Sequence, residues 1–411
     1  MRTQALQLVL FALFVLGTAA GAQERTLRIS FDDLDSLVAG NSPLAQTRSL
    51  ELDRVHASRE ADLRWSNPEL EYEHERVDAE REQVVALGKS FELPWKTSRR
   101  RAEWKYRIEA ADWRREQTHR QQLAEIRGGY VALSLYQRQL AILDQLDTTL
   151  DDVARIAAVR HEEGRISGIE SRQIQLAAIS VTGTRLELLA EYRQRRADWL
   201  TALGMNPADS LSLATAVTFA PRQLPGRDEL VAAAASTPGL RVLEAEQLAL
   251  AAHVDVQRSW LLPEVALSGG YKTVDPDLGG FVAGISLQLP LFSQNQASIR
   301  GAEIERSLVA TEAERERSRM SARIDALLTS IQETQRMLEE FTSISGANPD
   351  ALEDLLVAYA DGWLSLPDLL NAVQLEAGSL AGHTTLVLTW YESLFALEAL
   401  TGIDLARLPQ E

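Results

Sequence analysis

Residues 264–289 read EVALSGGYKTVDPDLGGFVAGISLQL, and this stretch decides the fold because its side chains alternate with a period of two. Residues 264–273 form one alternating run. After a turn-rich loop, residues 281–289 form another, which ends before Pro290. Each run has about ten residues, the length of a strand that crosses a bilayer at a tilt. The stretch therefore predicts two paired strands in a sequence that is otherwise mostly helical.

A second alternating pair of runs lies earlier in the chain, at residues 69–77 and 84–93. One face of this pair carries the glutamates Glu69, Glu71, Glu73, Glu75 and Glu92, and the other is mainly apolar. A polar interior opposite an apolar exterior is typical of a transmembrane barrel, so we expect these five side chains to face the barrel lumen. The alternative is a hairpin half-buried on a soluble core. It is less favoured because nothing else in the sequence has a strand pattern, and a lone hairpin would have no sheet to join.

The whole chain is a duplication. Trp65, Pro68 and Glu69 recur at a nearly constant spacing as Trp260, Pro263 and Glu264, and the same spacing relates Ser42-Pro43 to Thr237-Pro238. An offset that hardly drifts indicates that the two halves share one fold. We assign residues 23–235 to the first repeat and 236–411 to the second, after a signal peptide at 1–22 with a short apolar core and the cleavage site Ala20-Gly21-Ala22.

Long helices fill the rest of each repeat. Residues 97–163 contain no proline and predict a rod of roughly 100 Å, and residues 296–361 predict a second rod, broken at 346–349. A tight turn and a return helix follow each rod, at 169–204 and 365–403. By length, we expect 169–204 to continue end to end into 236–262, and 365–403 into 43–67. A short helix is expected within 27–39, and irregular chain at 205–235.

Composition excludes several functions. The chain has no cysteine, which excludes disulfides and an N-terminal lipid anchor on cysteine, and its net charge of −17 disfavours nucleic acid as a partner. No phosphate-binding loop, dinucleotide turn or catalytic triad pattern is present in the sequence. The sequence therefore predicts a protein that is not an enzyme and has no catalytic residue, cofactor or metal site.

A membrane sheet must close on itself to remove its edges, so a chain with four strands must oligomerise. Such a channel-tunnel resembles the TolC-like outer membrane efflux protein family. The resemblance rests on doubled motifs that occur in the same order in both halves: the Ser/Thr-Pro helix start, Trp-x-x-Pro-Glu before the strands, Leu-Pro at 93–94 and 289–290, and the Gly-x-x-Ser turns. It implies a homotrimer in outer-membrane lipid, with a twelve-stranded barrel and a long periplasmic α-barrel.

The same resemblance implies a passive exit duct that works with a periplasmic adaptor protein and an inner-membrane pump. Pumps of the resistance-nodulation-division type are favoured, including those of the CzcC-like heavy-metal group. Drug efflux and type I protein secretion remain open as alternatives. A structural coiled-coil protein of the cell envelope is a further alternative, but it would leave both strand pairs unexplained.

The resemblance also implies two sites on the helices. The turns after the long rods should lie at the periplasmic tip and contact the adaptor, through Gly164, Arg165, Ser167, Gly362, Trp363 and Ser365. The start of each return helix should narrow the periplasmic entrance, with Asp368, Asn371 and Glu170 as the gate residues. The alternative for Asp368 is an acid that stabilises the helix dipole of its own helix.

Overall fold

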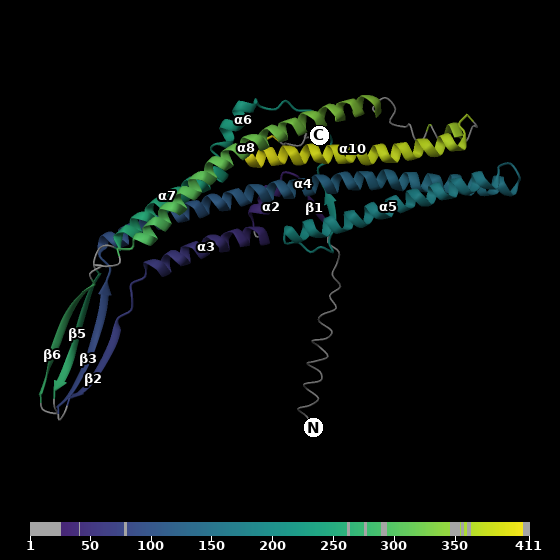
Figure 1. Cartoon of the computed structure of the whole chain (residues 1–411). Coiled ribbons are helices and arrows are strands. Elements are labelled where there is room, and N and C mark those ends of the chain that lie inside the picture. The colour runs from purple at the N-terminus through teal and green to yellow at the C-terminus, as the bar shows by residue number, and fades with distance from the viewer. Residues whose placement is uncertain are drawn as a thin grey trace, which may run out of the picture.

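The computed structural model describes residues 26–40, 42–77, 80–260, 264–274, 278–288, 294–345, 354, 357–359 and 363–405. The predicted signal peptide, the predicted break at 346–349 and Gly362 lie outside these residues. The chain forms a long helical body with a small sheet at one end (Figure 1). None of the helices in the described ranges has an apolar stretch long enough to cross a membrane.

The two halves contain the same elements in the same order. The first half consists of α3 (Pro43–Leu63), β2 (Glu69–Val77), β3 (Glu80–Phe91), α4 (Pro94–Glu162) and α5 (Gly168–Ala202). The second consists of α7 (Pro238–Ser259), β5 (Glu264–Val274), β6 (Leu278–Gln288), α8 (Gln296–Ser345) and α10 (Leu366–Thr401). Helices α3 and α7 both begin with proline, whose missing N–H would have no partner in the first turn. The repeated sequence landmarks therefore fall at matching ends of matching elements.

The four predicted strands form one antiparallel sheet in the order β2-β3-β5-β6. The central pair joins the two halves of the chain, since Ala86 of β3 lies opposite Glu71 of β2 on one side and Gly270 of β5 on the other. Within the described residues, the outer edges of β2 and β6 have no neighbouring strand. The sheet of a single chain is therefore open.

A second, smaller sheet lies beside the middle of the helical body. Strand β1 (Thr26–Ile29) pairs in parallel with β4 (Ser210–Leu213), and the short helices α2 (Leu34–Ala39) and α6 (Arg227–Ala234) follow these strands. The expectation that nothing else in the chain is β was wrong. So was the description of 205–235 as irregular throughout. Strands of four residues are too short to show an alternating pattern, and their partners are far apart in sequence.

Aromatic side chains form the main core at this level. Phe31 packs between Tyr130 of α4 and Phe395 of α10, with ring centroids 5.7 and 5.9 Å apart respectively. Trp199 of α5 lies so close to Gly129 that a Cβ there would be 2.5 Å from its ring. Gly129 therefore allows α4 and α5 to pack closely. The core thus joins helices from both halves in a single chain.

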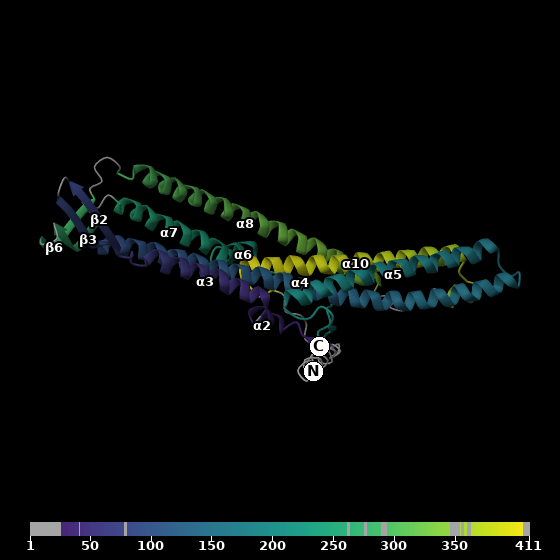
Figure 2. The same ribbon diagram turned by 90° about the horizontal axis from the view of Figure 1, so that it is seen from below.

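The end-to-end stacking of the helices differs from the prediction. Gly204, which ends α5 with φ 75°, lies against the ring of Pro43, which begins α3. Gly402 after α10 and Gly239 at the start of α7 contact Arg120 and Gln117, one turn apart on α4. Figures 1 and 2 accordingly show α5 continuing into α3, and α10 into α7. Each stacked pair lies within one half, not across the halves as the lengths had suggested.

Candidate channel lining and helical tip

The register of the four-stranded sheet places the acidic residues on one face. Glu69, Glu71 and Glu73 lie opposite Gly88, Ala86 and Val84. The same face continues over β5 and β6 with mainly small or polar residues, apart from Val274, Leu278 and Val282. Glu75 and Glu82 are directly opposite each other on this face. Lys272 forms an ion pair with Glu82 at 2.6 Å. This face is therefore polar and strongly acidic, with one lysine among the described strand residues.

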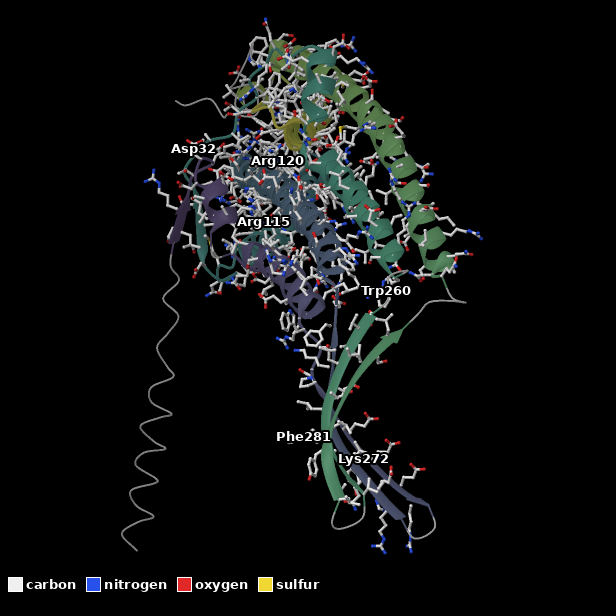
Figure 3. The ribbon with its side chains drawn as sticks, turned by 90° about the vertical axis from the view of Figure 1, so that its left-hand side faces the viewer. Asp32, Arg115, Arg120, Trp260, Lys272 and Phe281 are labelled. Atoms are coloured by element: carbon white, nitrogen blue, oxygen red, sulfur yellow. The ribbon has the colours of Figure 1, made fainter. Side chains whose placement is uncertain are left out.

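The opposite face of the sheet is apolar and exposed in the single chain. Phe281 is 93% exposed and Ile285 76%. Figure 3 shows Phe281 and Lys272 on different sides of the sheet. The other large apolar side chains on this face are also exposed: Leu70, Tyr72, Val85, Leu87, Phe91, Leu267, Tyr271 and Leu287. A contiguous apolar surface of this size needs a covering, either lipid or protein.

Charged and aromatic side chains fix the junction between sheet and helices. The ammonium group of Lys96 is buried; it lies 3.5 Å from the centre of the Trp260 ring and forms an ion pair with Glu264. Arg100 and the indole N–H of Trp104 both donate to Asp62, and Arg100 also pairs with Glu92 at 2.6 Å. These hydrogen bonds from Arg100 and Trp104 lower the pKa of Asp62 despite its partial burial, which opposes the shift.

The basic and tryptophan-rich segment after Leu93 is divided between the junction and the surface. Trp104 is buried and Arg100 forms ion pairs with Asp62 and Glu92, whereas Trp95 is 47% exposed. Glu92 was predicted to face the lumen. In the structure it lies just after the end of β3 and forms an ion pair with Arg100 at the junction.

The first helical turn is ordered by local hydrogen bonds. Gly164 has φ 72°, a left-handed conformation that favours glycine and ends α4. The Ser167 hydroxyl accepts from the Glu170 N–H at 3.2 Å, and the Glu170 carboxylate accepts from the Ser167 N–H at 2.9 Å. Glu170 is thus half of a capping box that begins α5. Arg165 is exposed and pairs with Glu163.

The second turn has a similar cap. The Ser365 hydroxyl accepts from the Asp368 N–H at 3.4 Å and donates to the Asp368 carboxylate. Trp363, next to this turn, is 86% exposed. Asp368 and Asn371 lie three residues apart on the exposed side of α10, whereas Leu369 and Val373 are buried against α4 and α5. In a single chain, Asp368 therefore forms hydrogen bonds with Ser365 at the start of α10 and is also exposed to solvent.

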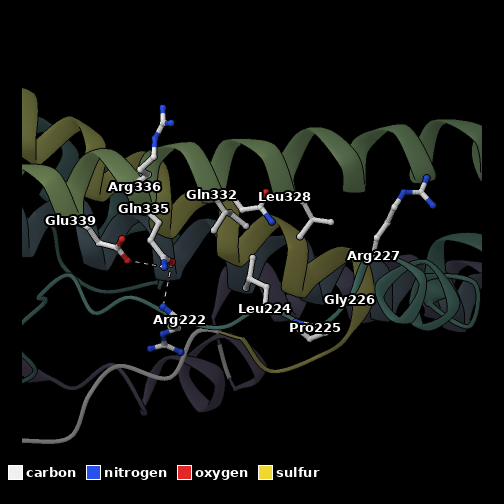
Figure 4. A pocket seen from close by; sticks show the side chains of 11 residues that line it. Arg222, Leu224, Pro225, Gly226, Arg227, Leu328, Gln332, Gln335, Arg336 and Glu339 are labelled. Carbon is white, nitrogen blue, oxygen red and sulfur yellow. Dashed lines mark hydrogen bonds between the residues drawn. The ribbon is translucent and has the colours of Figure 1, made fainter.

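The helical body also contains cavities that the sequence did not indicate. One of about 390 Å³ lies between the segment 222–227 and α8 (Figure 4). Gln335 on α8 accepts from the Arg222 N–H at 3.3 Å, and the Arg222 guanidinium donates to the carbonyl of Leu405. These bonds tie the segment between the two halves to α8 and to the chain after α10. No group of three or more potential metal-binding side chains occurs in the described part of the chain.

Residues 230–403 match the family model described as outer membrane efflux protein. The second half of this chain is therefore similar to this family. The solved structure of CusC, a protein that forms a transmembrane channel, superposes on this chain with a TM-score of 0.73 at 17% sequence identity. The match covers 93% of this chain and 94% of CusC. The chain as a whole has a TolC-like fold.

Two named relatives are similar in sequence. The nickel and cobalt resistance protein CnrC of Cupriavidus metallidurans is 25% identical over 272 residues, which cover 63% of this chain and 63% of CnrC. The nickel-cobalt-cadmium resistance protein NccC of Alcaligenes xylosoxydans xylosoxydans is 21% identical over 246 residues, covering 58% of this chain and 55% of NccC. The chain thus matches less than two thirds of the length of either relative.

Proposed function

We propose that this TolC-like chain assembles as a trimer whose three sheets close into a twelve-stranded barrel in the outer membrane. The observation that carries the proposal is the open sheet, which has one apolar face, one acidic face and two unpaired edges in the described chain. Closure with further copies would pair the edges of β2 and β6, and lipid would cover the apolar face. The long helices would then extend from the barrel into the periplasm.

In this arrangement the trimer is a passive exit duct for a tripartite efflux system. An inner-membrane pump would supply the energy, and a periplasmic adaptor would contact the turns around Gly164, Arg165, Ser167, Trp363 and Ser365. Gly362, predicted for the same contact, lies outside the described residues. The 86% exposure of Trp363 supports a contact with another protein, because a single chain leaves this large apolar ring in water.

Divalent metal cations are the substrates that we favour. The names of CnrC and NccC refer to resistance to nickel, cobalt and cadmium, and the polar face of the sheet is acidic. A ring of carboxylates in a low-dielectric wall concentrates cations without binding them tightly. The proposed gate consists of Asp368, Asn371 and Glu170, in which the acids would meet their copies at the narrow periplasmic entrance. Glu170 is half of a capping box, and Asp368 accepts from the Ser365 hydroxyl that caps α10, so the gate would use side chains that already have a local structural role.

The first test is conductance in planar bilayers, combined with detection of detergent-resistant trimers in outer-membrane fractions. The wild-type protein should form trimers and cation-preferring channels. Replacing Glu69, Glu71, Glu73 and Glu75 together with glutamine should reduce the cation-to-anion permeability ratio while trimers persist, because the lumen would lose twelve negative charges in three chains. An unchanged ratio would place control of selectivity elsewhere. Absence of both trimers and conductance would refute the duct.

A further inference from the structure

The strand charges are sorted between the two faces of the sheet. Among the strand residues whose side chains the structure describes, the glutamates lie on the polar face, where Lys272 is the only base: Glu69, Glu71, Glu73, Glu75, Glu82 and Glu264. Among the same residues, the apolar face has no carboxylate and carries four basic side chains: His74, Arg76, Arg81 and Lys89. All the charged side chains described on the face that would contact lipid are therefore basic.

Two of these bases are adjacent. Arg76 and Arg81 lie directly opposite each other across β2 and β3, at the end of the sheet farthest from the helices. Both are exposed, and within the described residues neither guanidinium has an ion pair or a hydrogen bond. Like charges in directly opposed positions destabilise a strand pair, so this end of the hairpin favours an anion that bridges the two guanidinium groups.

The position of the pair relative to the apolar band indicates which anion. Lys89, on the same face, lies over the ring of Trp65 at 4.7 Å, near the helical end of the sheet. From Lys89 to Arg81 the strand is about 27 Å long, and at a barrel tilt of about 40° it covers about 20 Å of depth, most of the apolar band of about 25 Å on an outer-membrane barrel. Leu70, Tyr72, Val85 and Leu87 occupy the part of this distance nearer Lys89, and the polar pair His74 and Gln83 lies between them and the arginines. The arginine pair would thus lie at headgroup depth on the side away from the helices.

We propose that Arg76 and Arg81 form a binding site for the phosphate group of a lipid headgroup in the outer leaflet. The inference rests on the proposed insertion of the sheet as a barrel. Paired guanidinium groups match phosphate oxygens through parallel N–H donors, and a lipid phosphate would be held there by its own acyl chains on the adjoining apolar face.

A neighbouring copy of the chain would not neutralise this pair. In a closed barrel, the edge of β2 would meet the edge of β6 from the next copy, and the segment Leu278–Gln288 contains no acidic residue. The hairpin turns contain Asp78, Asp275 and Asp277, which lie outside the described residues. Whether these aspartates neutralise the arginine pair is tested below with a triple Asp→Asn variant.

The test uses the full-length protein in detergent, with its thermal stability and its lipid adducts in native mass spectrometry as readouts. The probes are lipid A with two phosphates, the same lipid after phosphatase treatment, and inorganic phosphate. Diphosphoryl lipid A should bind and raise the melting temperature, whereas the dephosphorylated lipid and free phosphate should do so weakly. In Arg76→Gln/Arg81→Gln the apparent affinity for lipid A should fall by at least about tenfold.

Matched variants make the outcome specific. Lys272→Gln removes a base from the other face and should leave lipid binding unchanged, and Arg76→Lys/Arg81→Lys should retain part of it because charge persists without the planar fork. Asp78→Asn/Asp275→Asn/Asp277→Asn should bind lipid A at least as well as the wild type. Binding by Arg76→Gln/Arg81→Gln equal to that of the wild type, while both form conducting channels, would overturn the site but leave the duct intact. Absence of channels in the wild type would instead refute the barrel.

Discussion

Similar aromatic and aliphatic side chains have opposite environments at the middle of the helical body and in the four-stranded sheet. Phe395 of α10 is 2% exposed in the core with Phe31 and Tyr391, whereas Phe281 of β6 is 93% exposed. The core is completed within one chain by helices from both halves. No second layer in the described part of the chain buries the apolar face of the sheet. The contrast indicates that the helical body folds on contacts within the chain, while the sheet depends on lipid and on further copies.

The largest effect should come from truncating the core. Phe395→Ala should lower the free energy of unfolding by about 3–5 kcal/mol, because it leaves a cavity among packed rings. Phe281→Ala, the matched change on the sheet, should alter it by less than about 0.5 kcal/mol in detergent, apart from the loss of the edge contact with Tyr271. Thermal unfolding followed by circular dichroism measures both. Equal losses would show that the sheet is also packed within the chain.

A charge on the apolar face of the sheet should have the next largest effect, and only in a membrane. Ile285 lies level with Lys89, toward the helical edge of the apolar band, so Ile285→Arg should cost about 1–2 kcal/mol, less than the roughly 2–4 kcal/mol of a position at the bilayer midplane. Ser286→Arg, one residue later and on the polar face, should be tolerated. The yield of detergent-resistant trimers in outer-membrane fractions reports the difference. If Ser286→Arg lowers the yield more than Ile285→Arg, the faces are assigned the wrong way round.

The proposed gate is intermediate between the buried core and the exposed sheet. Asp368 forms a hydrogen bond with Ser365 within its own chain, but it is also exposed to solvent. As an acid in the first turn, Asp368 stabilises α10 by about 0.3–1 kcal/mol through the helix dipole, and Asp368→Ala should lower the melting temperature slightly. As a gate residue, it should also control conductance, so the variant should conduct more at rest and lose any block by divalent cations. Ser42→Ala, which removes the N-cap of α3 and no proposed gate residue, is the control for the loss of a cap alone. Unchanged conductance and block in Asp368→Ala would leave Asp368 with the capping role only.

The smallest effect concerns pH and the helical body. Burial and the nearby Arg138 lower the pKa of His383 below its ordinary value of 6.5, and its ring packs against Phe341 with centroids 4.6 Å apart. The unfolded chain therefore binds this proton more readily, so the contribution of His383 to stability is complete above the unfolded pKa and is lost as pH falls through the folded pKa. His383→Asn should reduce the drop in melting temperature between about pH 7.5 and about pH 5.5. The exposed His161, changed to glutamine, serves as the control. A drop as large in His383→Asn as in the wild type would contradict this assignment.

Much of the architecture follows from local sequence patterns. Alternation located the four strands and separated Glu69, Glu71, Glu73 and Glu75 from the apolar face, because successive side chains of a strand point to opposite sides. The turn at Gly164 and Ser167 was also predictable, since a left-handed glycine and a serine cap have local causes. The trimer, the gate and the adaptor contact were predicted from family resemblance and stay predictions.

Other features were decided only by tertiary structure. Helix lengths allowed the return helices to stack within a half or across the halves, and the contact of Gly204 with Pro43 selects stacking within the half. Strand β1 pairs with β4, and Arg100 forms an ion pair with Asp62. The local sequence patterns of these segments do not indicate which partner each one contacts. Periodicity and caps depend on neighbours along the chain, so the sequence determined the elements and their faces. Which elements meet depends on the packing of the whole chain around the core of Tyr130, Trp199 and Phe395, and only the tertiary structure decided it.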